Sequence, residues 1–202
     1  YFDVGSRILY YGNEMGQSQD FYVYMIAPND DESGLWGMRH PVNLGTGQDV
    51  KTDLPYNITF TVYSSDSSEE PLNFSIHDKV NNSYQWSMEI LRDVTPPTAV
   101  LLINETSSYL HTSQNTLYYG GNMDALEPFF LEVSGVDDDL AGFSNAEFPG
   151  IFDRPSEFLG SQDVPYEYKV NRSNRISGGY EIVVRDRVFN SLSLSLYLVR
   201  DI

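Results

Sequence analysis

The sequence predicts an all-β chain built as two tandem antiparallel β-sandwiches. Three observations predict this fold class: self-similarity at a spacing of 108 residues, apolar residues that alternate with polar ones, and turn-forming residues between the alternating segments. Alternation with a period of two places successive side chains on opposite faces of a strand, and helical periodicity is nearly absent. Several short strands in each hundred residues, separated by turns, are typical of a β-sandwich.

The internal repeat consists of five matches in one register. A fixed period of this kind indicates a duplicated structural unit. The matched segments are Leu9-Tyr10-Tyr11-Gly12 with Leu117-Tyr118-Tyr119-Gly120, Asp30-Asp31 and Gly34 with Asp138-Asp139 and Gly142, Pro41 with Pro149, residues 78–83 with 186–191, and Arg92-Asp93 with Arg200-Asp201.

A short linker is expected between the copies. Pro96 and Pro97 restrict the backbone to extended conformations and cannot donate to a strand ladder. We therefore predict domains at 1–94 and 95–202. Residues 98–116 have no counterpart in the first copy, so we expect that copy to lack most of its opening strand unless residues 1–4 replace it. Either the sequence is a piece of a longer array, or a neighbouring chain supplies the strand.

Strands are assigned from alternation in both copies. Leu192, Leu194, Leu196 and Leu198 are expected in the second core, and their counterparts Tyr84, Trp86, Met88 and Ile90 in the first. Residues 37–55 are expected to form a long loop. Further strands are predicted at 20–27 and 129–136, at 58–63 and 166–170, and at 72–77 and 180–185.

Composition excludes several functional classes. The net charge of −17 disfavours nucleic acid, because a phosphate backbone would be repelled. The absence of cysteine excludes disulfide scaffolds and thiolate sites. His40, His77 and His111 have no recognisable metal-ligand spacing. The apolar runs are too short to span a membrane, and no signal peptide is recognisable.

The strand-closing segments carry a family resemblance. Tyr180-Glu181-Ile182-Val183-Val184-Arg185-Asp186, followed by Asn190 and Arg200-Asp201, resembles the end of the immunoglobulin-like repeats of bacterial and archaeal surface proteins. Phe74-Ser75-Ile76-His77-Asp78, Asn82 and Asp93-Val94-Thr95-Pro96-Pro97 are similar in the first copy. The family's usual glycine before the turn asparagine is Asn81 or Phe189 here. The resemblance implies two immunoglobulin-like sandwiches from a stalk, an adhesin, a surface layer or an accessory domain of a secreted enzyme.

Clustered carboxylates are candidate calcium ligands, because Ca²⁺ requires several oxygen atoms close together. The clusters are Asp30, Asp31 and Glu32 in the first copy and Asp137, Asp138 and Asp139 in the second. Asp78, Asp93 and Asp186 are expected near the domain ends and could contribute, as in cadherin-like junctions. The alternative is a solvated turn in which aspartate bonds the backbone, and for Asp78 and Asp186 we favour this structural role.

Trp36 and the glycosylation sequons are candidate surface features. Trp36 corresponds to Ser144, and if its neighbour Leu35 faces the core, the indole faces outward and could stack on a sugar or a protein. Alternatively, the long loop covers it. The Asn-x-Ser/Thr sequons are Asn57, Asn73, Asn81, Asn104 and Asn171, which glycans could occupy in an exported protein.

These features favour a non-catalytic structural or adhesive module of an extracellular, cell-surface or secreted protein. No acid stands out among 29 Asp and Glu residues as half of a catalytic pair, and no Ser-His-Asp arrangement or phosphate loop is apparent. No cofactor is required, apart from a possible structural calcium ion. The expected partners are neighbouring immunoglobulin-like domains, with glycans or other surface proteins as further candidates. The alternative function is an accessory carbohydrate- or protein-binding domain of a secreted hydrolase.

Overall fold

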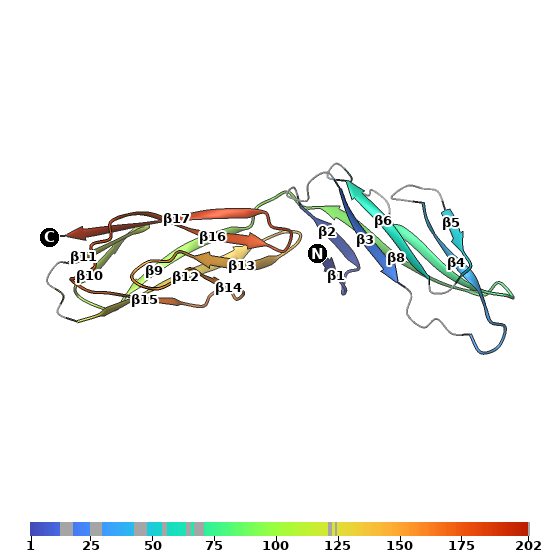
Figure 1. Cartoon of the computed structure of the whole chain (residues 1–202), viewed down its shortest axis with the longest axis horizontal. Coiled ribbons are helices and arrows are strands. Elements are labelled where there is room, and N and C mark those ends of the chain that lie inside the picture. Colours follow the sequence, from blue (N-terminus) through green and yellow to red (C-terminus); the bar gives the residue numbers. More distant parts are fainter. Residues whose placement is uncertain are drawn as a thin grey trace. The chain divides into compact units, whose positions relative to one another are not determined.

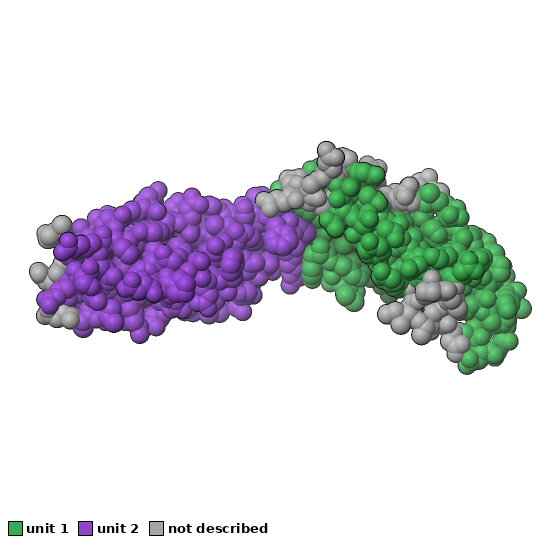
Figure 2. Space-filling model, in the orientation of Figure 1, with its two compact units in different colours: residues 1–94 green, residues 95–202 purple. Residues whose placement is uncertain are grey.

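The chain folds as two compact units, residues 1–94 (unit 1) and 95–202 (unit 2) (Figure 2). The computed structural model describes residues 1–12, 18–24, 30–42, 48–53, 56–63, 66, 71–120, 123 and 125–201. The division falls at the Thr-Pro-Pro segment, where the repeat places its boundary. Each unit is all-β (Figure 1).

Unit 1 contains two sheets in its described residues. The larger has the strand order β1-β2-β8-β7-β4-β5, and the smaller pairs β3 with β6. The strands are β1 (Phe2–Asp3), β2 (Ile8–Tyr11), β3 (Ser18–Tyr24), β4 (Leu35–Pro41), β5 (Gln48–Lys51), β6 (Asn57–Tyr63), β7 (Leu72–Asp78) and β8 (Ser83–Arg92).

Unit 2 repeats this arrangement with one additional strand. Its larger sheet has the order β10-β11-β17-β16-β13-β14, and its smaller sheet the order β15-β12-β9. The strands are β9 (Thr98–Glu105), β10 (Leu110–Ser113), β11 (Thr116–Gly120), β12 (Glu127–Asp137), β13 (Phe143–Phe148), β14 (Glu157–Leu159), β15 (Tyr166–Val170), β16 (Gly178–Asp186) and β17 (Ser191–Asp201).

The all-β sandwich fold is as expected, but among the described strands one pair in each unit is parallel, which the expected antiparallel sandwiches did not include. Strand β2 runs parallel to β8, and β11 runs parallel to β17. Side-chain alternation has a period of two in both kinds of ladder. The pattern therefore predicts the strands without predicting their relative direction.

The expected long loop at residues 37–55 is also wrong, because β4 and β5 pair within it. The register of β4 against β7 shifts between Leu35 and Gly37, which marks a β-bulge. A bulge inserts one residue and interrupts the alternation, so this strand lacks the pattern by which the others are recognised. The same irregularity occurs in β13, between Phe143 and Asn145.

The additional strand of unit 2 is the opening segment that the first copy was expected to lack. Strand β9 pairs antiparallel with β12. Strand β3, which corresponds to β12 in unit 1, pairs only with β6 among the described residues. Residues 1–4 do not replace this strand, because Phe2–Asp3 pair with β2 in the larger sheet. In unit 2, β10 pairs with β11 at the corresponding edge.

Each unit buries its own core between its two sheets. Phe129 and Tyr168 of the smaller sheet stack in unit 2 and share a core with Ile182 and Leu196 of the larger sheet. In unit 1, Phe60 from the smaller sheet meets Phe74 from the larger one edge to face. This interlocking of two inner faces makes each unit a β-sandwich.

Most of the predicted core row of β8 and β17 is confirmed. Met88, Ile90, Leu196 and Leu198 are buried, and Trp86 stacks on Phe74 with 4.0 Å between ring centroids. Tyr84 is the exception: it is 65% exposed, so its assignment to the core is wrong. It lies near the start of β8, where the corresponding Leu192 is also only partly buried.

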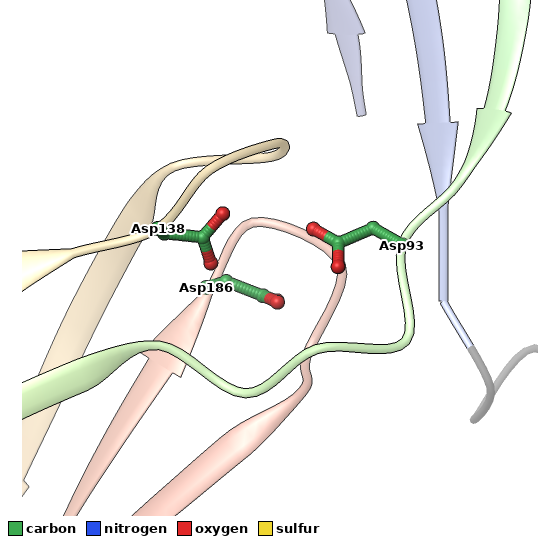
Figure 3. Close-up of side chains that lie close together, drawn as sticks. All are labelled: Asp93, Asp138 and Asp186. Carbon is green, nitrogen blue, oxygen red and sulfur yellow. The ribbon is translucent and has the colours of Figure 1, made fainter.

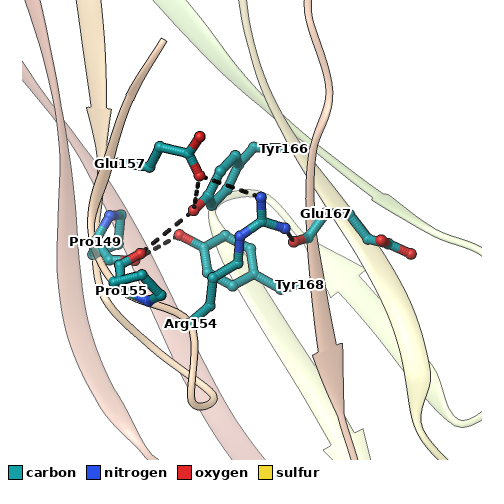
Figure 4. A network of polar contacts seen from close by, with 7 residues as sticks. All are labelled: Pro149, Arg154, Pro155, Glu157, Tyr166, Glu167 and Tyr168. Atoms are coloured by element: carbon teal, nitrogen blue, oxygen red, sulfur yellow. Dashed lines mark hydrogen bonds and ion pairs between the residues drawn. The ribbon is translucent and has the colours of Figure 1, made fainter.

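A polar network fastens the segment after β13 to strand β15 in unit 2 (Figure 4). The Arg154 guanidinium lies 3.8 Å from the centroid of the Tyr166 ring. The Tyr166 hydroxyl donates to Glu157 Oε2 at 3.0 Å, and the Tyr168 hydroxyl donates to the Pro149 carbonyl at 2.7 Å. Both tyrosines are buried, so these bonds satisfy hydroxyl groups that would otherwise be costly to bury.

We predict that Phe189→Gly stabilises unit 2. Phe189 has a φ of 70° in the β16–β17 turn and is 60% exposed, so its ring contributes little packing to offset the left-handed backbone. This conformation costs most L-residues roughly 1–2 kcal/mol, and glycine avoids most of that cost. The expected gain is about 0.5–1 kcal/mol in the free energy of unfolding of unit 2, measured by calorimetry of the full chain.

Asn81→Gly is the matched control, because Asn81 holds the same turn position with a φ of 68°. Asparagine tolerates this conformation well, so the change in unit 1 should stay within about 0.5 kcal/mol. An equal gain in both units, or a loss in unit 2, would contradict this account of the turn.

We also predict that unit 2 loses stability as the pH rises above the ordinary tyrosine range. Burial raises the pKa of Tyr168, because it disfavours the phenolate. The pKa of Tyr168 is higher in the folded state than its unfolded value of about 10. The contribution of neutral Tyr168 to the free energy of unfolding is therefore complete below a pH of about 10 and is lost as the pH rises through the folded pKa. In urea unfolding across the alkaline range, Tyr168→Phe should flatten the decline, whereas Tyr197→Phe, at an exposed position, should not. Identical slopes for both variants would refute the assignment.

Candidate metal site

Asp186 ends β16 and organises the turn into β17. Its Oδ1 accepts hydrogen bonds from the backbone N–H groups of Val188 at 2.8 Å and Asn190 at 2.9 Å. Its Oδ2 accepts from Asn190 Nδ2 at 2.8 Å. The residue is completely buried, and an aspartate is suited to this position because its short side chain reaches the backbone of its own turn.

Asp138 lies in the neighbouring turn, between β12 and β13. Its Oδ1 accepts hydrogen bonds from the backbone N–H groups of Leu140 at 3.0 Å and Gly142 at 3.1 Å. Gly142 has a φ of 78°, which explains a glycine at the end of this turn. The second oxygen, Oδ2, is buried and has no hydrogen-bond partner among the described residues. One carboxylate oxygen is therefore available for a ligand.

Figure 3 shows a group of three carboxylates that could hold a metal ion. The third belongs to Asp93, the residue that follows β8. One oxygen from each of Asp93, Asp138 and Asp186 lies within 4.8 Å of the others, and Asp93 and Asp186 are completely buried. Negative charges this close repel one another, and more strongly where water is excluded. A cation that prefers oxygen ligands would relieve this repulsion.

Unit 1 satisfies the corresponding carboxylates internally. Ser33 Oγ donates to Asp30 Oδ2 at 2.7 Å, and this bond is the main reason that the pKa of Asp30 is lowered. Burial alone would raise the pKa of Asp78, but hydrogen bonds from Asn82, Ser33 and Val80 outweigh it and lower the pKa. In unit 1, a serine hydroxyl thus satisfies the second oxygen of Asp30, and Asn82 Nδ2 satisfies the second oxygen of Asp78.

Unit 2 lacks that hydroxyl, because Ala141 stands where unit 1 has Ser33. Ala141 is buried at 2% exposure and offers no side-chain donor. The loss explains why Asp138 Oδ2 has no partner in the described part of the chain while the equivalent oxygen of Asp30 has one. The difference between Ser33 and Ala141 is visible in the repeat alignment, so the sequence itself carries this signal.

The predicted clusters separate in the structure. Of the run 137–139, only Asp138 joins the group of three, while Asp137 ends β12 opposite Thr98 and Asp139 is exposed. In unit 1, Asp31 and Glu32 are both exposed on the turn that follows Asp30. Neighbouring residues of one turn point in different directions, so the convergent carboxylates come from separate segments. Asp93 and Asp186, considered as contributors, are those that lie beside Asp138.

Trp36 faces outward, as expected if its neighbour lies against the core. The indole is 42% exposed, whereas Leu35 packs against the core of unit 1. Four sequon asparagines, Asn57, Asn73, Asn81 and Asn104, are exposed, and Asn171 is partly buried. These positions suit glycans, but glycosylation itself stays a prediction.

Within the part of the chain that the structure describes, no helix has the length and apolar character needed to cross a membrane. No protein-family model and no curated protein matches the chain. Among solved structures, it is similar to the fibronectin(III)-like modules of Clostridium thermocellum CbhA, with 13% identity and a TM-score of 0.42 over 99% of this chain and 94% of that one. A second similarity is to Bacteroides ovatus SGBP-B, from a mixed-linkage glucan utilization locus and in complex with a mixed-linkage heptasaccharide, with 10% identity and a TM-score of 0.20 over 98% of this chain and 44% of that one. The β-sandwich assignment itself follows from the strands and sheets described above.

Proposed function

We propose that the chain is a non-catalytic structural module of an extracellular or cell-surface protein, in which immunoglobulin-like sandwiches are spaced or assembled into a larger array. The duplication supports this proposal, because each unit has its own core and the two are joined by a short linker with two prolines. Prolines keep such a linker extended and limit its conformations. Neighbouring domains of the same protein are the expected partners.

We further propose that a calcium ion binds at Asp93, Asp138 and Asp186. The observation that carries this step is the convergence of one oxygen from each carboxylate within 4.8 Å. Three carboxylates suit a hard cation, and no histidine belongs to the group. Calcium is preferred over magnesium, because its coordination is flexible and it accepts protein carboxylates readily, whereas magnesium retains several waters.

The proposal predicts a calcium-dependent stability of unit 2. Extracellular calcium modules bind with a Kd of about 10⁻⁴–10⁻³ M. At ten times the Kd, a ligand specific for the folded state adds about 1.4 kcal/mol to the free energy of unfolding, which raises the Tm of a domain of this size by several degrees. Calorimetric titration of the full chain with CaCl₂, and thermal unfolding in CaCl₂ or EDTA, measure both effects.

Three variants make this experiment specific. Asp138→Asn should abolish the calcium effect, and Asp30→Asn, the matched change in unit 1, should leave it intact. Ala141→Ser restores the hydroxyl that unit 1 has, and should weaken calcium binding because a hydrogen bond then occupies Asp138 Oδ2. If the wild-type chain shows no saturable calcium binding, or if Asp30→Asn loses as much as Asp138→Asn, the calcium proposal is wrong.

A further inference from the structure

The outer face of the larger sheet of unit 1 contains a polar hollow of about 450 Å³. Strand alternation explains its position: Phe74 of β7 faces the core, so Ser75 and His77 have the opposite direction on the same strand. In the ladder, Ser75 lies opposite Arg39 of β4 on one side and Gln85 of β8 on the other. All four polar residues line the hollow, as do Arg7 and Gln48.

The hollow is positively charged on a strongly acidic chain. Arg7 and Arg39 line it, and no carboxylate does so among the described residues. Neither arginine forms an ion pair within the described part of the chain, although Arg39 lies 5.9 Å from the Trp36 ring centroid. With 12 Lys and Arg against 29 Asp and Glu, two cations without carboxylate partners on one concave surface indicate recognition of an anion. Planar guanidinium groups bind carboxylates and sulfates with two parallel hydrogen bonds.

His77 provides an independent indication of a ligand. It lines the hollow, is only 8% exposed, and its Nε2 lies 2.8 Å from Ser75 Oγ. Its Nδ1 is buried and has no hydrogen-bond partner among the described residues. Buried polar atoms in folded proteins nearly always have a partner, so such an exception marks a place where a bound group would complete the bonding. The exposed indole of Trp36 meets the His77 ring at 87°, beside the hollow.

Unit 2 shows that the fold does not require these residues. The positions of Arg39, His77 and Trp36 are Glu147, Arg185 and Ser144 in unit 2. There, Arg185 Nη2 and Glu147 Oε2 form an ion pair at 3.0 Å, so the charges on this face neutralise each other. An ion pair thus joins two side chains on this sheet face in unit 2, whereas no ion pair of Arg7 or Arg39 occurs among the described residues of unit 1. The residues of unit 1 are therefore explained better by a ligand than by the needs of the sheet.

We propose that this hollow binds an acidic saccharide, whose carboxylate or sulfate contacts Arg7 and Arg39. The amides of Gln48 and Gln85 suit the ring hydroxyls, since an amide both donates and accepts hydrogen bonds. The indole of Trp36 offers a flat apolar surface beside this polar lining, which suits the C–H face of a sugar ring. The volume falls within the range of small-ligand sites, about 300–1,000 Å³. The mainly polar lining favours a saccharide over a ligand with apolar side chains.

The test is titration of the full, unglycosylated chain with three probes of equal length: an oligogalacturonide, a sulfated oligosaccharide and a neutral oligogalactoside. Unglycosylated protein is required because Asn73, a sequon asparagine, also lines the hollow. EDTA is present throughout, so that calcium cannot bridge an acidic sugar to the carboxylates of unit 2. At least one acidic probe should bind saturably and at least tenfold more tightly than the neutral one, with an affinity that falls as salt is raised.

Variants assign the binding to the hollow. Arg39→Gln and Arg7→Gln should each weaken binding about tenfold, and Trp36→Ser, which introduces the residue of unit 2, about fivefold. Arg39→Lys should give an intermediate loss, because the charge remains but the planar fork is removed. Arg185→Gln, the matched change in unit 2, should leave binding unchanged. Thermal unfolding of each variant checks that unit 1 remains folded.

The two acidic probes identify the anionic group: preference for the oligogalacturonide assigns a carboxylate, and preference for the sulfated probe assigns a sulfate. Three results would overturn the proposal. These are equal binding of the neutral probe, an equal loss with Arg185→Gln, and binding of poly-glutamate as tight as that of the acidic saccharides. The last result would assign the surface to an acidic peptide. None of these outcomes depends on calcium binding at unit 2.

Discussion

The structure depends on a carboxylate in the turn between the last two strands of each unit. In unit 2, the buried Asp186 accepts two backbone hydrogen bonds and one side-chain hydrogen bond from its turn, and Asp78 makes the equivalent three in unit 1. By joining consecutive long strands, each turn sets the register in which they pair. That register decides which side chains enter the core and which line the outer face. In unit 2, the same carboxylate also belongs to the group of three that could hold a metal ion.

Duplication has given two copies of one scaffold different chemistry. A serine hydroxyl satisfies Asp30 Oδ2 in unit 1, whereas in unit 2 Ala141 offers no hydroxyl and Asp138 Oδ2 has no partner among the described residues. On the outer face of the larger sheet, unit 2 is the internally satisfied copy, because Arg185 and Glu147 form an ion pair there. At the same positions in unit 1, His77 and Arg39 line the hollow. At the carboxylate turn and at the outer sheet face, a few residue differences between the repeats decide which copy bonds its own polar groups and which copy has a candidate binding site. Each unit therefore shows that the fold forms without the candidate site of the other unit.

Much of the fold could be predicted from the sequence, because period-2 alternation and a common register give strands, core rows and the linker directly. The β4 strand escaped prediction because a bulge at Leu35 and Gly37 interrupts its alternation. The parallel pairing of β2 with β8 escaped because alternation carries no direction. The candidate sites were harder. Asp138 was named within a run of carboxylates, but only the fold separates it from Asp137 and Asp139, and the hollow joins residues from strands distant in the sequence.

The most direct test of this account is hydrogen exchange and denaturant unfolding of the full chain carrying Asp186→Ala. The account predicts that β16 and β17 lose amide protection and that the free energy of unfolding of unit 2 falls by roughly 3 kcal/mol, because the substitution removes charge-assisted hydrogen bonds from buried donors. Unit 1 should keep its protection pattern. If β16 and β17 retain wild-type protection and unit 2 loses less than about 0.5 kcal/mol, the turn carboxylate does not hold the sandwich in register.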